Sequence, residues 1–230
     1  MDFFASVFGK GASYGTLNSY RAAIGRIIGG ELTQDPQVKK CFRGAYNIRP
    51  NPPKYEDTWD PELVLNLARK LPNDGITLEQ LTWKLAVLLA ICTGQRVQTL
   101  HNIEVQNVTV DDKIEIKIPE RLKSSGRNVP QSTLILPFFH SVKDICPATA
   151  VQIYLEKTKP IRGTTEKLFI TTKPPFRSAS TQTISRWIKA MLRASGIDTD
   201  KDSSYTTSHA SSSAAARRGF NYDTIRKAAC

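Results

Sequence analysis

The sequence is poor in the residues that bind metals or cross-link a chain. It has only four cysteines and three histidines among 230 residues. These residues are Cys41, Cys92, Cys146, Cys230, His101, His140 and His209. No CxxC pair occurs, and the histidines do not recur at the spacing of metal ligands. The pattern excludes a zinc-finger arrangement and a dense disulfide framework, so we predict no metal and no cofactor.

The sequence also lacks a long apolar run. No stretch reaches the roughly 18 apolar residues that a membrane-spanning helix requires. At the N-terminus, Asp2 stands where a signal peptide would carry basic residues. We therefore expect an intracellular protein that has no membrane partner.

Acidic side chains are fewer than basic ones. The sequence has 21 Asp and Glu residues and 32 Lys and Arg residues, which gives a net charge of +11. This excess favours a polyanionic partner, with nucleic acid as the leading class, although a basic protein without such a partner has the same composition. A hydrophobic fraction of 40% and a charged fraction of 23% are typical of a folded globular chain. The length predicts one main domain with room for a small appendage.

The first 47 residues predict a small helical piece with two helices. The apolar residues of the first helix recur at helical spacing and are Leu17, Tyr20, Ile24, Ile27 and Ile28. The second helix is predicted to begin at Asp35-Pro36 and to end near Gly44. Residues 48–59 carry three prolines and no periodicity, which predicts a linker. The larger domain is then expected to span 60–230.

The larger domain is predicted to be helical around a small sheet. Thr77 and Gln80 form a capping box for a helix that is apolar almost all round and so belongs in the core. Alternating apolar residues over 108–118, with a turn at Asp111-Asp112, predict a β-hairpin, and Leu134 and Leu136 indicate a third strand. Helices are also predicted from Asp60, Pro147, Ser180, Ala210 and Asn221. Residues 168–170 are predicted to form a short strand or an extended core segment. The predicted fold class is mainly α with a small antiparallel three-stranded β-sheet (α+β).

Two segments of the sequence carry recognisable motifs. In the first, Thr93-Gly94-Gln95-Arg96, a buried helix is predicted to end at Thr-Gly and an arginine follows two residues later. This motif resembles the first arginine box of the tyrosine recombinase (phage integrase) family. The second comprises 184–196 and 210–229, which are similar to recombinases of eukaryotic mobile elements, including the DIRS type. The resemblance covers nearly the whole chain. It implies an integrase-like catalytic domain, a truncated core-binding (SAM-like) N-terminal piece and a nuclear location.

The resemblance also implies roles for two cations. In this family a tyrosine attacks a DNA phosphodiester and forms a 3′-phosphotyrosyl intermediate without a metal. Two arginines bind the phosphate oxygens and stabilise the charge, while a lysine or histidine protonates the leaving group. Arg96 matches the first arginine. Lys123 lies where the family places its catalytic lysine, although a solvated hairpin lysine fits the same position.

The second arginine box, His-x-x-Arg in the family, is altered in this chain. Aligned without a gap, Tyr205 takes the histidine position and Ser208 the arginine position. If His209 is taken as the histidine instead, Ser212 takes the arginine position. In both registers the second phosphate-binding arginine is absent.

The nucleophile is also expected to be absent. Tyr222 is the last tyrosine, and it stands where the family has an ordinary residue at the start of a helix. The resemblance therefore implies a domain that lacks the C-terminal nucleophile segment, in which Arg96 and Lys123 are vestigial. Without a nucleophile, phosphotyrosyl chemistry cannot begin.

What remains is binding to double-stranded DNA, with assembly of several copies on the DNA as a further implication of the resemblance. The candidate DNA contacts are Arg21, Arg26, Arg121, Arg127, Arg186, Lys189, Arg193, Arg217 and Arg218. Three functions stay open. They are a catalytically inactive DNA-binding protein, an active recombinase represented by an incomplete chain, and a protein-interaction module.

Overall fold

The computed structural model describes residues 2–50, 58–118, 133–202, 204, 206–221 and 224. The chain divides into two compact units, Met1–Asp57 and Thr58–Cys230. The division falls inside the stretch 48–59, where the prolines predict a linker. Each unit is described by itself.

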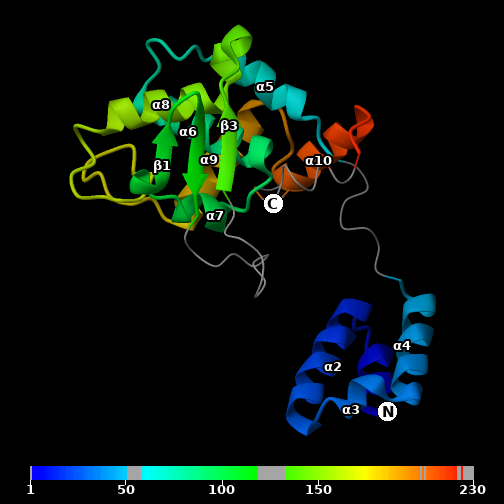
Figure 1. Ribbon diagram of the computed structural model, residues 1–230. Coiled ribbons are helices and arrows are strands. Elements are labelled where there is room, and N and C mark those ends of the chain that lie inside the picture. Colours follow the sequence, from blue (N-terminus) through cyan, green and yellow to red (C-terminus); the bar gives the residue numbers. More distant parts are fainter. Residues whose placement is uncertain are drawn as a thin grey trace. The chain divides into compact units, whose positions relative to one another are not determined.

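The first unit contains four helices, where the sequence predicted two. They are α1 (Asp2–Gly9), α2 (Tyr14–Ile28), α3 (Glu31–Gln34) and α4 (Pro36–Ile48) (Figure 1). The predicted end of α4 near Gly44 is wrong, since the helix continues to Ile48. A glycine inside a helix costs about 1 kcal/mol, and burial of the neighbouring Phe42 and Ala45 outweighs that cost.

The core of the first unit is small. Its buried residues are Phe4, Leu17, Val38, Phe42 and Ala45. The apolar stripe predicted on α2 is only partly buried, because Tyr20, Ile27 and Ile28 are exposed. Helix α2 instead turns Leu17 and Gly25 inward, and a Cβ at Gly25 would lie 3.1 Å from Thr33 Cγ2. The close approach to Thr33 thus favours glycine at this position.

The second unit is mainly helical with one small sheet, as predicted. Its helices are α5 (Pro61–Arg69), α6 (Leu78–Thr93), α7 (Val97–Asn102), η1 (Val105–Asn107), η2 (His140–Ile145), α8 (Pro147–Thr158), α9 (Thr181–Ala194) and α10 (Thr207–Arg217). The strands are β1 (Val108–Val110), β2 (Lys113–Lys117) and β3 (Thr133–Pro137), which pair antiparallel in the order β1-β2-β3. Ile114 lies opposite Leu136 and Ile116 opposite Leu134, so the apolar face of the sheet points into the core.

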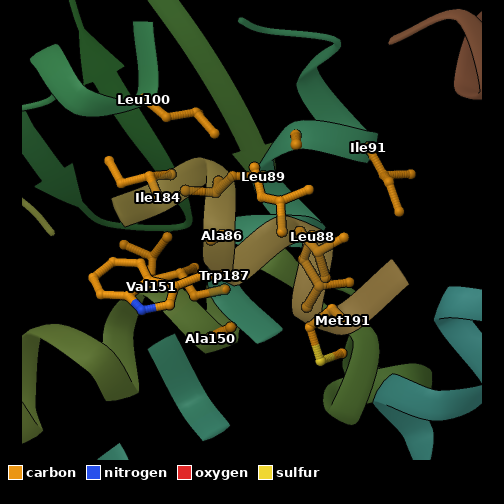
Figure 2. Packing of buried hydrophobic residues seen from close by; sticks show 14 of the residues in the cluster. Ala86, Leu88, Leu89, Ile91, Leu100, Ala150, Val151, Ile184, Trp187 and Met191 are labelled. Carbon is orange, nitrogen blue, oxygen red and sulfur yellow. The ribbon is translucent and has the colours of Figure 1, made fainter. Parts of the chain in front are cut away.

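Helix α6 is at the centre of the second unit. The capping box at its start is confirmed, because the Gln80 backbone N–H donates to Thr77 Oγ1 and Gln80 Oε1 accepts from the Thr77 backbone, both at 3.2 Å. Helices α8, α9 and α10 contact it. Figure 2 shows side chains of α6 packed among Ala150 and Val151 of α8 and Trp187 and Met191 of α9. This helix therefore positions the elements that flank it.

Helix α9 presents one apolar face to the core. Ser180 caps it by accepting from the Thr183 backbone N–H. The buried side chains are Ile184, Trp187, Ile188, Met191 and Leu192, as predicted from their spacing. Each such side chain stabilises the fold by about 1.5 to 3 kcal/mol. The charged side chains of α9 are consequently turned away from the core.

Residues 168–170 form a buried core segment, one of the two predicted possibilities, with isolated bridges between Glu104 and Lys167 and between Ile170 and Ser178. Helix α10 begins at Thr207, earlier than the predicted Ala210, because Thr207 is buried and starts the helix against the core. The last predicted helix, over 222–229, lies outside the described residues.

One charged side chain lies inside the core. Lys84 of α6 is fully buried, and its Nζ donates to the Leu71 carbonyl at 2.5 Å and to Asn73 Oδ1 at 2.9 Å. Asn73 donates in turn to Asp144 Oδ1 and to the Lys143 carbonyl. Burial lowers the pKa of Lys84 to about 8, against the opposing effect of the Asp144 carboxylate. The network ties the loop before α6 to η2.

The depressed pKa of Lys84 predicts a gain in stability at alkaline pH. Between about pH 8 and the ordinary lysine value of 10.5, the unfolded chain binds more protons than the folded chain, so stability rises with pH. We expect the wild type to gain on the order of 2 kcal/mol over Lys84→Met between about pH 7 and about pH 10. Urea unfolding of both proteins across this range measures the difference. An equal response of the two proteins to pH would contradict the prediction.

Candidate nucleic-acid interface

Arg96 is held at a sharp turn between two helices. Helix α6 ends at Gly94, which adopts the left-handed conformation with φ 63°. The Gln95 side chain is buried, and Arg96 follows as the residue that precedes the first turn of α7. Its side chain is exposed, and no described residue forms a hydrogen bond or ion pair with its guanidinium. The turn thus presents an unpaired cation to solvent.

Helix α7 is fixed against the start of α9. His101 Nδ1 lies 2.9 Å from the Ala179 carbonyl oxygen, which accepts the hydrogen bond. Residues of α7 also pack on α9. Since Arg96 immediately precedes α7, this contact places the Arg96 turn relative to α9.

Helix α9 carries three of the predicted DNA contacts on one face. Arg186, Lys189 and Arg193 recur at helical spacing, opposite the five buried apolar residues. Arg186 and Arg193 are exposed, and Lys189 is half-buried. Arg193 Nη2 also donates to Thr199 Oγ1 at 3.1 Å, which orients its guanidinium without neutralising the charge. The face is a set of cations suited to an extended anion.

The segment that enters α10 is held by side-chain hydrogen bonds. Ser204 Oγ lies 2.7 Å from Ser185 Oγ of α9, and Thr207 Oγ1 donates to the Ser204 carbonyl at 2.9 Å. Trp59 Nε1 donates to Thr206 Oγ1 at 2.9 Å. Ser208 follows in the first turn of α10. These contacts hold Ser208, which one of the two sequence registers aligns with the second arginine.

The contacts of Trp59, Ser185, Ser204 and Thr206 were not predicted. Trp59 was assigned to the linker, but it is buried in the core of the second unit. Its hydrogen-bond partner Thr206 lies 147 positions away in the sequence, so local residue spacing cannot predict the pair. Only the three-dimensional arrangement brings these residues together.

The two arginines at the end of α10 differ. Arg217 is exposed, whereas Arg218 Nη2 lies 3.5 Å from Glu62 Oε2 of α5. The prediction treated both as DNA contacts. The ion pair reduces the field of Arg218 toward an external anion, so Arg217 is the better candidate of the two.

The cations of the first unit also differ from one another. The Arg21 guanidinium lies 4.6 Å from the centroid of the Phe42 ring, a cation–π contact inside the unit. Arg26 is exposed. Helix α4 additionally exposes Lys39, Lys40 and Arg43. The prediction did not include these three, although their spacing against the buried Val38 and Phe42 marks a polar helix face.

Several predicted site residues cannot be placed. Lys123, Arg121, Arg127 and Tyr205 lie outside the described residues. Their roles therefore stay predictions.

A tyrosine nucleophile is not found in the described part of the second unit. Tyr154 is the sole tyrosine there, and it is fully buried. Its hydroxyl accepts from the Ile170 backbone N–H at 3.1 Å, and burial raises the pKa of Tyr154 above its ordinary value. A buried, structurally bonded phenol cannot reach a phosphodiester.

Other kinds of site would need a metal-ligand cluster, a membrane-spanning helix or a suitable pocket in the ranges that the structure describes. No cluster of three or more metal-ligating side chains occurs there. No helix among the described residues has the length and apolar character needed to cross a membrane. A hollow of about 420 Å³ lies between the β1–β2 turn, η2 and α8, and none of the predicted DNA contacts lines it. The cationic surface is the feature that remains.

Solved structures share this architecture at low sequence identity. The XerH site-specific recombinase bound to its difH substrate matches 99% of this chain with a TM-score of 0.58 and 12% identity, and the chain spans 61% of the XerH length. The Tn1549 transposon integrase in complex with circular intermediate DNA matches 99% of this chain and 75% of its own, with a TM-score of 0.59 and 13% identity. XerA recombinase matches 98% and 79% of the two chains, with a TM-score of 0.52 and 16% identity.

Sequence comparison adds nothing to this. No family model matches the chain. No curated protein matches it either. The second unit nevertheless has the integrase catalytic-domain fold. Its structural neighbours are tyrosine recombinases and integrases.

Substitutions of Arg21 and Arg26 compare an arginine that contacts an aromatic ring with one that is exposed. Arg21→Ala removes the cation–π contact with Phe42, and we expect the first unit to lose about 0.5 to 1 kcal/mol of stability. Arg26→Ala changes stability by less than about 0.5 kcal/mol, because no described residue pairs with Arg26. Hydrogen exchange of α2 and α4 amides measures both. Equal protection in the two variants would show that the ring contact contributes nothing.

Proposed function

We propose that this chain is a catalytically inactive member of the tyrosine recombinase family that binds duplex DNA through its phosphates. The observations that carry the proposal are the unpaired Arg96 at the start of α7 and the cationic face of α9, both on an integrase fold. Two structural neighbours, XerH and the Tn1549 integrase, are seen in complex with DNA. The net charge of +11 supports a polyanionic partner.

We infer inactivity because phosphoryl transfer needs a second arginine and a nucleophile. One arginine brings only half of the positive charge and donors that two arginines bring to the phosphate, and the Ser208 hydroxyl carries no charge to replace the second. In another phosphoryl-transfer system, a transition-state arginine contributes about 10³ to 10⁵ in rate. Tyr154 is buried and unavailable as a nucleophile. The remaining cations support DNA binding, which needs neither a second arginine nor a nucleophile.

The finer ancestry is part of the same proposal. The similarity of 184–196 and 210–229 to recombinases of DIRS-type mobile elements supports descent from such an element. A nuclear location would follow from that ancestry.

Phosphate binding predicts a steep salt dependence. With four or more phosphate contacts, affinity for a duplex of arbitrary sequence is expected to fall on the order of 10²-fold between about 50 and 200 mM salt. Arg96→Ala should weaken binding and reduce the slope of log K against log salt by about one. Lys143→Ala is the matched control, because it removes an exposed cation from η2, which carries none of the candidate contacts. Absence of binding at about 50 mM salt, or a flat salt dependence, contradicts the proposal.

Inactivity is tested by a covalent trap. A nicked suicide duplex captures any 3′-phosphotyrosyl intermediate as an adduct that survives denaturing electrophoresis. We expect no adduct with the wild type under conditions where the duplex is bound. An adduct that forms with the wild type would establish an active recombinase and overturn the inactive assignment.

A further inference from the structure

Trp59 stands at an unusual position in the chain. It is the second residue after the division between the units, which falls between Asp57 and Thr58. Its ring is 9% exposed and belongs to the core of the second unit. Asp60 directly afterwards caps α5 by accepting from the Glu62 backbone N–H. Core packing of Trp59 and the helix cap at Asp60 therefore hold the first residues of the second unit in place.

The indole N–H of Trp59 is directed to the segment that enters α10. Nε1 donates to Thr206 Oγ1 at 2.9 Å, and the Thr206 side chain is 1% exposed. A buried hydrogen bond that is lost leaves an unsatisfied polar group, so this pair resists separation. Thr206 lies two positions before Ser208 and one before the first residue of α10.

Two contacts from different elements hold the segment that enters α10. The Ser185–Ser204 contact holds the segment from α9, and Trp59 holds it from the start of the unit. The N-terminal turn of α10 is therefore set between two anchors on different elements.

We propose that Trp59 is a positioning residue for the candidate DNA interface, acting through Thr206 on the first turn of α10. The inference rests on the proposed DNA binding and adds a path by which the start of the second unit influences it. A displacement of the chain at Thr58 moves Trp59, and the hydrogen bond carries that displacement to Thr206 and Ser208. This contact and the Ser185–Ser204 contact hold the first turn of α10, the helix that ends at Arg217.

The test removes the hydrogen bond while keeping an aromatic ring. Trp59→Phe deletes the donor, Thr206→Val deletes the acceptor, and Thr206→Ser keeps it. In the full chain we expect the first two variants to weaken duplex DNA binding by about three- to tenfold, with no further loss in the double variant. Thr206→Ser should bind as the wild type does. Trp83→Phe is the matched control, because Trp83 Nε1 is buried without a hydrogen-bond partner and its loss breaks no such bond.

Hydrogen exchange of the Ala210 amide, which donates to the Thr206 carbonyl at 2.8 Å, gives a second readout that does not involve DNA. Exchange should accelerate by about threefold or more in Trp59→Phe and Thr206→Val, and not in Trp83→Phe. If the wild type fails to bind DNA, the proposed function is wrong, and accelerated exchange alone would still support the positioning role. If the wild type binds but all variants bind and exchange alike, only the positioning role is wrong. Equal losses in Trp59→Phe and Trp83→Phe would reduce Trp59 to ordinary core packing.

Discussion

Helix α6 is apolar around nearly its whole circumference, and a helix of that kind is stable in water only when other elements cover every side of it. Helices α8, α9 and α10 provide that cover, and each presents its own apolar residues to α6. The positions of the flanking helices, and of the Arg96 turn at the end of α6, follow from this requirement. Lys84 is the one ionisable group that α6 buries within the described residues, and the loop carbonyl and amide around it compensate for its burial.

The features that the sequence predicted are those with local causes. The capping box at Thr77, the left-handed Gly94 and the apolar face of α9 depend on neighbours within a few positions, and the structure contains all three. Short helices were missed, since α1 and α3 carry too few turns to show a period. The exposure of Ile27, at 83%, was also missed, because spacing predicts which residues share a face but not whether anything covers it.

In the candidate site, too, the sequence predicted features with local causes and missed those that depend on distant contacts. Arg96 and the α9 cations were found from a motif and a helical period. The buried hydroxyls around α10 were not, because Ser185 pairs with Ser204 across a helix boundary and Trp59 pairs with Thr206 across most of the unit. Nor could spacing show that Arg218 is already engaged by Glu62 while Arg217 is not. The sequence gives the charge of each residue, but the packing of the fold determines whether that charge is available to a partner.

The Trp59–Thr206 and Glu62–Arg218 contacts join residues 147 and 156 positions apart. They bring the start of the second unit against both ends of α10. A tension applied between Thr58 and the end of α10 would load these two contacts together with the packing of α10 on α5 and α6. Mechanical unfolding of the second unit would therefore start by separating α10 from both helices.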